Sequence, residues 1–186
     1  MIQRDLSKSW IEDVEYFKQQ KEIGDKYLKL ICDRLQKEYS IPCGLFEDEY
    51  SDFRENPKQI KNYTANNKDL WIINKNYLFE GKSRNINFQT KEDWPMNLWP
   101  MFVDTVEGFD AKIKKPLGYI FISQFSHRLL ATSVKQHKNT WSEAEKFDTC
   151  RKIKVPFYFV DEPYVMNEEE LIEKLKQLQQ FHSRSN

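Results

Sequence analysis

Glycine, cysteine and long apolar runs are all scarce in this chain, and each shortage removes a class of protein. With only 5 glycines in 186 residues, loops that wrap nucleotide phosphates are not expected, and no such motif is present. The three cysteines (Cys32, Cys43 and Cys150) lack metal-ligand spacing, which predicts reduced thiols in a cytoplasmic protein. No apolar run is long enough to cross a bilayer and no apolar signal segment opens the chain, so no membrane partner is expected.

The chain also lacks a net charge, since 29 basic side chains balance 29 acidic ones. Nucleic-acid-binding proteins normally carry a positively charged binding surface. In this chain such a surface has to come from local clusters of basic residues. Basic residues gather at 112–115, 128–138 and 151–154, and acidic residues at 47–55 and 161–170. This pattern predicts one basic and one acidic face, with an ordinary mixed surface as the alternative. The candidate nucleic-acid-binding residues are Arg84, Lys135, Lys138, Arg151 and Lys152.

Apolar and aromatic residues, in contrast, are plentiful at 39% and 15%, enough for one folded domain over residues 1–186. The spacing of apolar residues predicts helical structure over 6–39 and a C-terminal helix that Asn167 caps, with Glu170 placed to complete a capping box. Segment 102–113 is either a hairpin that turns at Glu107-Gly108 or a short helix. Strands are expected at 45–46, at 69–83 as a hairpin, and at 118–124, 129–134 and 155–160.

The most informative stretch runs from Asp69 to Lys82, with the sequence DLWIINKNYLFEGK. It predicts two short strands joined at a turn, with an acid opening the first strand and acid-x-lysine closing the second. A two-residue turn at 75–76 pairs Asp69 with Lys82. Glu80 then lies on the same face, because alternate residues of a strand share a face. This prediction requires an even loop without a bulge, since a shift of one residue turns Asp69 to the other face.

These residues resemble the active-site hairpin of the PD-(D/E)XK nuclease superfamily, in which an aspartate at the start of one strand precedes acid-x-lysine in the next. Asp69, Glu80 and Lys82 match that motif. Two positions depart from it, because Lys68 stands where proline is common and Gly81 where a larger side chain usually packs. The resemblance implies a restriction-endonuclease-like α/β fold, with a mixed central sheet whose active-site hairpin is flanked by helices.

The resemblance further implies a metal-dependent nuclease, with a DNA endonuclease favoured over an enzyme of the same fold that cleaves RNA. Asp69 and Glu80 are then the ligands of Mg²⁺ or Mn²⁺, because these hard cations prefer carboxylate oxygens. Lys82 positions or deprotonates the attacking water and stabilises negative charge on the phosphate. The family often adds an acid from its first long helix. The candidate here is Glu22, and its rivals are Asp25 and Glu38.

Other interpretations of the same residues stay open. Glu80 and Lys82 can form an ion pair on a solvated sheet face, which contributes only tenths of a kcal/mol. Asp110-Ala-Lys112 repeats the acid-x-lysine pattern, but it lacks an earlier acid on the same face and is the poorer candidate. A non-enzymatic module that binds nucleic acid or protein is therefore a further hypothesis. The sequence leaves open the substrate specificity, the number of metal ions and whether the protein is a homodimer.

Overall fold

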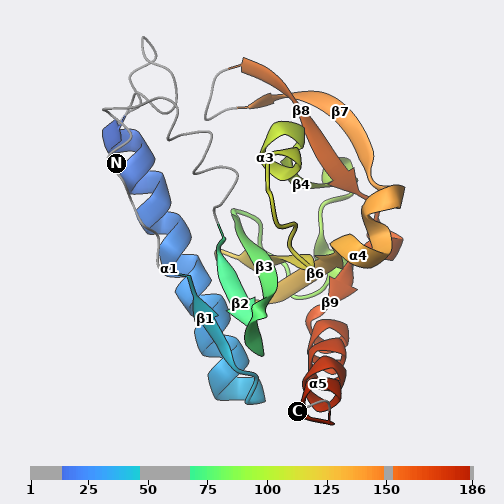
Figure 1. Cartoon of the computed structure of the whole chain (residues 1–186). Coiled ribbons are helices and arrows are strands. Elements are labelled where there is room, and N and C mark those ends of the chain that lie inside the picture. Colours follow the sequence, from blue (N-terminus) through green and yellow to red (C-terminus); the bar gives the residue numbers. More distant parts are fainter. Residues whose placement is uncertain (1–13, 47–67, 149–152, 185–186) are drawn as a thin grey trace.

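The computed structural model describes residues 14–46, 68–148 and 153–184, and these residues form a mixed α/β fold with four α helices (Figure 1). The helices are α1 (Val14–Tyr39), α3 (Val106–Asp110), α4 (Val134–His137) and α5 (Glu168–Arg184). A mixed six-stranded sheet contains, in spatial order, β1 (Cys43–Leu45), β2 (Leu70–Ile72), β3 (Asn74–Arg84), β5 (Gly118–Ser123), β6 (Leu129–Ser133) and β9 (Met166–Asn167). A three-stranded sheet contains, in spatial order, β4 (Met101–Thr105), β8 (Ile153–Val160) and β7 (Ser142–Asp148).

Strand β3 lies inside the large sheet, antiparallel to β2 on one side and parallel to β5 on the other. Parallel neighbours require a long crossover connection, and this one passes through β4 and α3 before the chain returns to β5. Met101, Val103 and Phe109 of the crossover pack against Tyr119 and Phe121 of β5. The crossover therefore brings residues that lie far along the sequence onto one face of β3 and β5.

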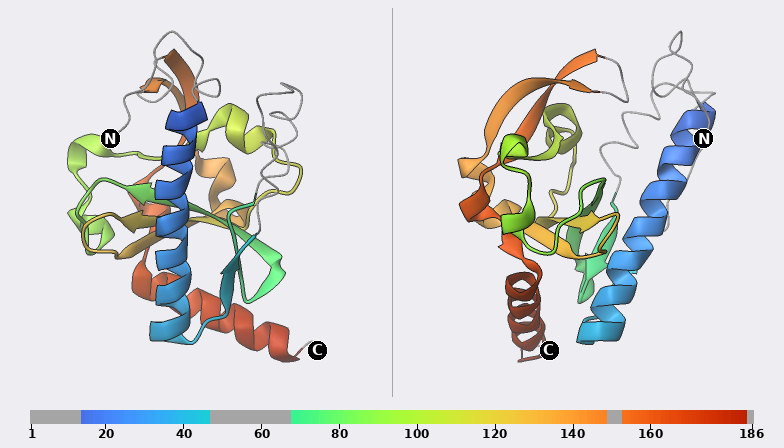
Figure 2. Two further views of the ribbon diagram at one scale, coloured as in Figure 1. Left: turned by 90° about the vertical axis from the view of Figure 1, so that its left-hand side faces the viewer. Right: turned by 180° about the vertical axis from the view of Figure 1, so that it is seen from behind.

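Strand β5 shows how the two layers are assembled, since all of its residues are buried. Ile120 and Ile122 belong to the apolar core that includes residues of α1 and α5. Tyr119 and Phe121 belong to the core shared with the small sheet. The large sheet thus has helices on one face and the small sheet on the other (Figure 2). The expectation of a buried strand at 118–124 is confirmed.

The hairpin of β2 and β3 differs from the expected one at its turn. Ile73, with a φ of 74°, forms the turn, and Ile72 pairs directly with Asn74. The prediction of a turn at 75–76 is therefore wrong, because these residues lie within β3. The side-chain Oδ1 of Asn74 accepts the backbone N–H of Asn76 at 2.8 Å, and such local hydrogen bonds compete with regular strand pairing.

The register shifts farther along the hairpin, so the prediction of a hairpin without a bulge is also wrong. Leu70 pairs with Phe79 beyond the irregularity. Continuing this register by one step sets Asp69 opposite Glu80, whereas a tight two-residue turn sets it opposite Lys82. Because the two registers differ by two positions and side chains alternate with a period of two, Asp69 stays on the face of Glu80 and Lys82 in both.

Segment 102–113 contains the expected short helix, α3, and strand β4 precedes it directly. The Thr105 side chain accepts the backbone N–H of Gly108 at 3.0 Å and so caps the N-terminus of α3. Thr is a favoured residue at this position because its oxygen satisfies a donor that the helix leaves unpaired. A hairpin that turns at 107–108 is thereby excluded, and β4 pairs with β8 in the small sheet.

The C-terminal helix begins directly after Asn167, as expected, but the Asn167 side chain is bonded elsewhere, because its Oδ1 accepts the backbone N–H of Lys91 at 2.6 Å. Asn167 precedes α5, and its backbone N–H donates to Glu170 Oε2 at 2.8 Å, which is one half of the expected capping box. The strands expected at 129–134 and 155–160 correspond to β6 and β8, although β8 belongs to the small sheet. None of the helices in the described ranges has the length and apolar composition needed to span a bilayer.

Candidate active site

Glu80 lies at the centre of the candidate site, on the inner strand β3. It is 3% exposed. Its Oε1 lies 2.9 Å from Lys112 Nζ, and its Oε2 lies 3.7 Å from Lys82 Nζ. Burial and the neighbouring Asp69 carboxylate raise the pKa of Glu80 to about 8, against the attraction of the two lysines. The site therefore holds a carboxyl group whose proton affinity is set first by burial and then by charged neighbours, an arrangement common at functional sites.

Asp69 stands just before β2 and is held against β3 by the backbone. Its Oδ2 accepts the N–H of Gly81 at 3.0 Å. This bond fixes the carboxylate beside the peptide that joins Glu80 and Gly81. The charge of Asp69 is also one of the causes that raise the pKa of Glu80, so the two carboxylates interact electrostatically. The structure thus brings together the two acids that the sequence pattern singles out.

Lys82 is the third residue of the motif, and its side chain is 27% exposed. Its Nζ lies 3.5 Å from Asp104 Oδ2 and 3.7 Å from Glu80 Oε2. Burial lowers the pKa of Lys82, but the surrounding carboxylates, led by Asp104, outweigh that effect and raise it above its usual value. Lys82 is therefore a persistent cation that borders solvent on one side and carboxylates on the other.

Asp104 and Tyr119 complete the surroundings of Lys82, and the sequence pattern did not single out either residue. Asp104 Oδ1 accepts the N–H of Thr105 at 2.9 Å, and its Oδ2 accepts the hydroxyl of Tyr119 at 2.8 Å. Asp104 belongs to the small sheet, so no local spacing connects it with Lys82. Tyr119 stands within an apolar strand, where its hydroxyl group is the only sequence signal of a polar role.

Lys112 joins the site from the crossover that follows α3. It is 7% exposed, and its ammonium group contacts Glu80 Oε1. The second acid-x-lysine pattern thus contributes its lysine to the same site as the first. Its acid does something else, because the Asp110 carboxylate accepts the hydroxyl of Tyr158 at 3.2 and 3.1 Å.

Gly81, between the acid and the lysine, lies where helix α1 approaches β3 closely. A Cβ atom at Gly81 would lie 2.3 Å from Leu28 Cδ2 and 3.1 Å from Ile31 Cδ1, both on α1. The helix therefore approaches β3 more closely than a side chain at this position allows. Because strand residues alternate, Glu80 and Lys82 point away from α1 and toward the small sheet.

The candidate acids of the first helix lie in different surroundings. Glu22 is exposed on α1, while Glu38 pairs with Arg34 at 3.1 Å. The additional carboxylate beside Lys82 is that of Asp104, which comes from β4. The helix thus supplies the packing surface beneath Gly81.

The candidate nucleic-acid-binding residues divide into different environments. Arg84 lies between the rings of Phe102 and Phe121, 4.9 and 4.8 Å from their centroids, and donates to the Phe102 carbonyl at 2.7 Å. Burial lowers the pKa of Arg84 to about 10 despite the opposing charge of Asp104, so Arg84 has a packing role. Lys135 is exposed on α4. Arg151 and Lys152 lie outside the described residues.

Lys138 and two other lysines form a group beside the site, here called the lysine cluster (Lys112, Lys115 and Lys138). The ammonium groups of Lys115 and Lys138 lie 4.8 and 5.4 Å from the centroid of the same ring, that of Phe109. Burial lowers the pKa of Lys115, Asp110 opposes this, and the other two lysines lower it further. The fold therefore holds like charges close together, which favours the binding of an anion.

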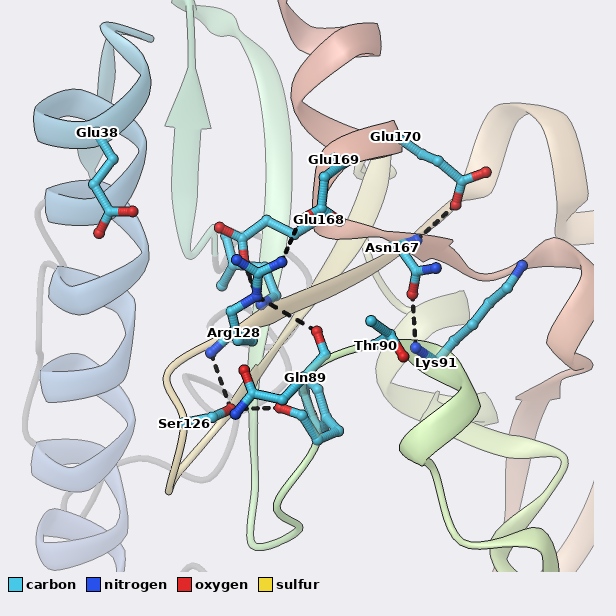
Figure 3. A network of polar contacts seen from close by, with 12 residues as sticks. Glu38, Gln89, Thr90, Lys91, Ser126, Arg128, Asn167, Glu168, Glu169 and Glu170 are labelled. Carbon is cyan, nitrogen blue, oxygen red and sulfur yellow. Dashed lines mark hydrogen bonds and ion pairs between the residues drawn. The ribbon is translucent and has the colours of Figure 1, made fainter.

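A second buried carboxylate, Glu168, lies in the polar network of Figure 3 and has a different character. Its Oε1 accepts from Arg34 Nε and the Tyr39 hydroxyl, both at 2.6 Å. Its Oε2 accepts the Leu129 N–H at 3.0 Å and lies 3.2 Å from Arg128 Nε. With both oxygens bonded to residues of α1 and β6, Glu168 joins these elements to α5 and is structural. Arg128, expected on a basic face, serves this network.

The donor set of the candidate site suits a hard divalent cation. Among residues 14–46, 68–148 and 153–184, no group of three or more His, Cys, Asp or Glu side chains is arranged to hold a metal ion. Mg²⁺, however, is usually held by one or two carboxylates together with waters and substrate phosphates. The carboxylates of Asp69 and Glu80 meet that smaller requirement.

No family model, no curated protein and no solved structure matches this chain. The candidate site itself consists of two interacting carboxylates at the open end of a hairpin, a lysine that stays charged, and the neighbouring lysine cluster.

Proposed function

We propose that this protein is a metal-dependent nuclease with a restriction-endonuclease-like fold, and that a DNA endonuclease is its favoured form. One observation carries the proposal. Asp69 accepts the N–H of Gly81 at 3.0 Å, while Lys82 Nζ lies 3.7 Å from Glu80 Oε2. Two carboxylates and a lysine thus meet on one face at the end of two adjacent strands, which is the arrangement that phosphodiester hydrolysis needs.

The order of the elements supports the same proposal. The described chain runs from α1 through the antiparallel strands β1, β2 and β3, and then by way of α3 to β5, which lies parallel to β3. PD-(D/E)XK nucleases share a core of helix, three strands, helix and strand, with the hairpin at its centre. The helix between β3 and β5 is only 5 residues long here, so the small sheet covers much of the face that contains Lys82.

In the proposed reaction, Asp69 and Glu80 would hold Mg²⁺ or Mn²⁺, and the ion would supply Lewis-acid activation of the scissile phosphate and of the attacking water. Lys82 donates hydrogen bonds to the phosphate or the attacking water and stabilises the negative charge that develops during attack. Since neighbouring carboxylates raise the pKa of Lys82, it acts as a cationic donor and not as the general base. Asp104 holds the ammonium group in place from the small sheet.

The lysine cluster supports a nucleic-acid substrate. Lys115 Nζ donates to the carbonyls of Phe109 and Asp110 at 2.7 and 2.8 Å, and Lys138 Nζ lies 3.6 Å from the centroid of the Tyr158 ring. Carbonyls and rings hold these two cations while leaving charge available for phosphates. Contacts with phosphates are independent of base sequence, so the cluster suits DNA and RNA alike.

A cleavage assay tests the proposal directly. Single- and double-stranded DNA and RNA are incubated with the protein in Mg²⁺, Mn²⁺ or EDTA, and the parent is compared with Lys82→Ala. Lys114→Ala is the control for loss of a lysine, because Lys114 is exposed between α3 and β5 and makes no part of the candidate site. We expect metal-dependent cleavage that Lys82→Ala abolishes and Lys114→Ala preserves. Background that is equal in all three proteins and insensitive to EDTA would refute the proposal.

The Glu80–Lys112 contact of 2.9 Å favours a second candidate, a binding module without catalytic activity. An ion pair of this kind compensates a buried carboxylate without any metal ion. In that case the lysine cluster binds nucleic acid, and the motif residues only stabilise the fold. Nucleic-acid binding without metal binding and without cleavage is the result expected of this candidate.

A further inference from the structure

Lys112 is the residue of the candidate site whose position the nuclease motif does not explain. It reaches Glu80 from the crossover, 32 positions farther along the chain. Lys112 is 7% exposed, and its Nζ is 2.9 Å from Glu80 Oε1, within hydrogen-bonding distance. Placing an ammonium group in such an environment is costly unless a carboxylate compensates it. The contact between Lys112 and Glu80 is thus a close, buried ion pair.

Lys112 and Lys82 contact different oxygens of Glu80, and the two contacts differ in length. Lys112 Nζ lies at hydrogen-bonding distance from Oε1, so it occupies a lone pair there. Lys82 Nζ is 3.7 Å from Oε2 and 3.5 Å from Asp104 Oδ2, so it lies between two carboxylates at the range of a loose ion pair. Lys82 can therefore keep its place through Asp104 when Glu80 takes another partner, whereas Lys112 directly occupies an oxygen that a metal ion needs.

We propose that Lys112 is a positioning residue that holds the Glu80 carboxylate in the metal-free protein and yields Glu80 Oε1 to the metal ion. The proposal rests on the proposed function, in which Glu80 is a metal ligand. Two cations that share one buried carboxylate repel each other. Lys112 therefore lowers the affinity of the site for the ion while it keeps Glu80 in place for binding.

This competition has a consequence that a merely structural ion pair lacks. Replacing Lys112 by Met keeps an unbranched apolar stem and removes the positive charge beside Glu80. The affinity for a divalent ion then increases, by about tenfold or more, because one like charge at close range is removed. If Lys112 only stabilises the fold, its loss leaves the affinity unchanged or lowers it as Glu80 becomes less ordered.

Isothermal titration of Mn²⁺ into the full chain measures this effect without any substrate. The proteins compared are the parent, Lys112→Met and the control Lys114→Met, which removes the same charge from an exposed position of the same crossover. We expect tighter Mn²⁺ binding in Lys112→Met and parent affinity in Lys114→Met. Parent affinity or weaker binding in a folded Lys112→Met protein overturns the proposal, and so does an equal gain in both variants.

A second measurement needs no variant and covers the case in which Lys112→Met does not fold. Lysines of the parent are modified with an amine-reactive ester, with and without Mn²⁺, and the extent of reaction at each lysine is determined by mass spectrometry. We expect Lys112 to react faster when Mn²⁺ is present, because its ammonium group leaves Glu80, while exposed Lys114 reacts equally in both conditions. Protection of Lys112 that persists at saturating Mn²⁺ overturns the proposal.

The outcomes separate this inference from the proposed function. A parent that binds Mn²⁺ and cleaves nucleic acid, with a Lys112→Met variant of unchanged affinity, leaves the nuclease in place and removes only the role of Lys112. A parent and a Lys112→Met variant that both fail to bind Mn²⁺ and to cleave nucleic acid overturn the two together.

Discussion

Tyr119 donates its hydroxyl proton to Asp104 Oδ2 at 2.8 Å, and this hydrogen bond crosses from one sheet to the other. The same Oδ2 atom lies 3.5 Å from Lys82 Nζ. One carboxylate oxygen therefore links the packing of the two sheets to the position of the proposed catalytic lysine.

Removing the Tyr119 hydroxyl tests this link. We expect Tyr119→Phe to lower the free energy of unfolding by about 1.5–3 kcal/mol, the net value of a hydrogen bond to a charged group, and to reduce metal-dependent cleavage because Asp104 is less firmly held. Urea denaturation and the cleavage assay measure the two effects. The matched control is Tyr39→Phe, which removes a hydroxyl bonded to Glu168 at 2.6 Å and should lose stability only. Equal losses of cleavage in both variants would argue against a link to Lys82.

The raised pKa of Glu80 predicts how metal affinity depends on pH. Burial and the Asp69 charge raise this pKa to about 8, so the carboxyl group binds a proton more tightly than an ordinary glutamate does. A metal ion must displace that proton below the pKa. We expect Mg²⁺ affinity to increase about tenfold per pH unit from pH 6 toward 8 and then to level off. Calorimetric titrations at pH 6, 7, 8 and 9 measure it, and an affinity that is constant over this range contradicts the prediction.

Glu168 predicts a large effect on stability away from the candidate site. Its side chain is completely buried among Arg34, Arg128 and Tyr39. We expect Glu168→Gln to lower the free energy of unfolding by about 3–5 kcal/mol, because Arg34 and Arg128 lose the buried anion that lies between them and keep only more exposed partners. The control is Glu169→Gln, whose side chain is 68% exposed although it also pairs with Arg128, and which should cost at most about 1 kcal/mol. Similar losses in the two variants would show that Glu168 is not the central anion.

The close approach of α1 to Gly81 predicts coupling between two substitutions. Gly81→Ala places a methyl group 2.3 Å from the present position of Leu28 Cδ2, so the leucine must shift, at a cost of about 1–3 kcal/mol. A Leu28→Ala background removes the closest of these contacts and leaves those with Ile31 Cδ1 at 3.1 Å and Leu70 Cδ2 at 3.2 Å. We therefore expect Gly81→Ala to cost less there, by about 0.5 kcal/mol or more, in a double-mutant cycle measured by urea denaturation. Additive effects would mean that the helix does not restrict this position.

Local patterns in the sequence were sufficient for several elements and for the three motif residues. The apolar run of β5, the start of α5 after Asn167 and the shared face of Glu80 and Lys82 all follow from interactions within a few residues. Alternation along a strand has a period of two, so the common face survived a turn and a register that were both predicted wrongly. The turn lies instead at Ile73, whose positive φ a β-branched residue rarely adopts, so no local pattern pointed to it.

Tertiary structure alone decided what surrounds those residues. Lys112 and Asp104 reach the site because the crossover from β3 to the parallel strand β5 passes through a second sheet and folds back over the first. No local spacing encodes that path, since it depends on how the apolar faces of distant segments pack together. The sequence by itself determined which carboxylates and which lysine share a face. The packing of the two sheets determined that a buried second lysine is bound to one of those carboxylates.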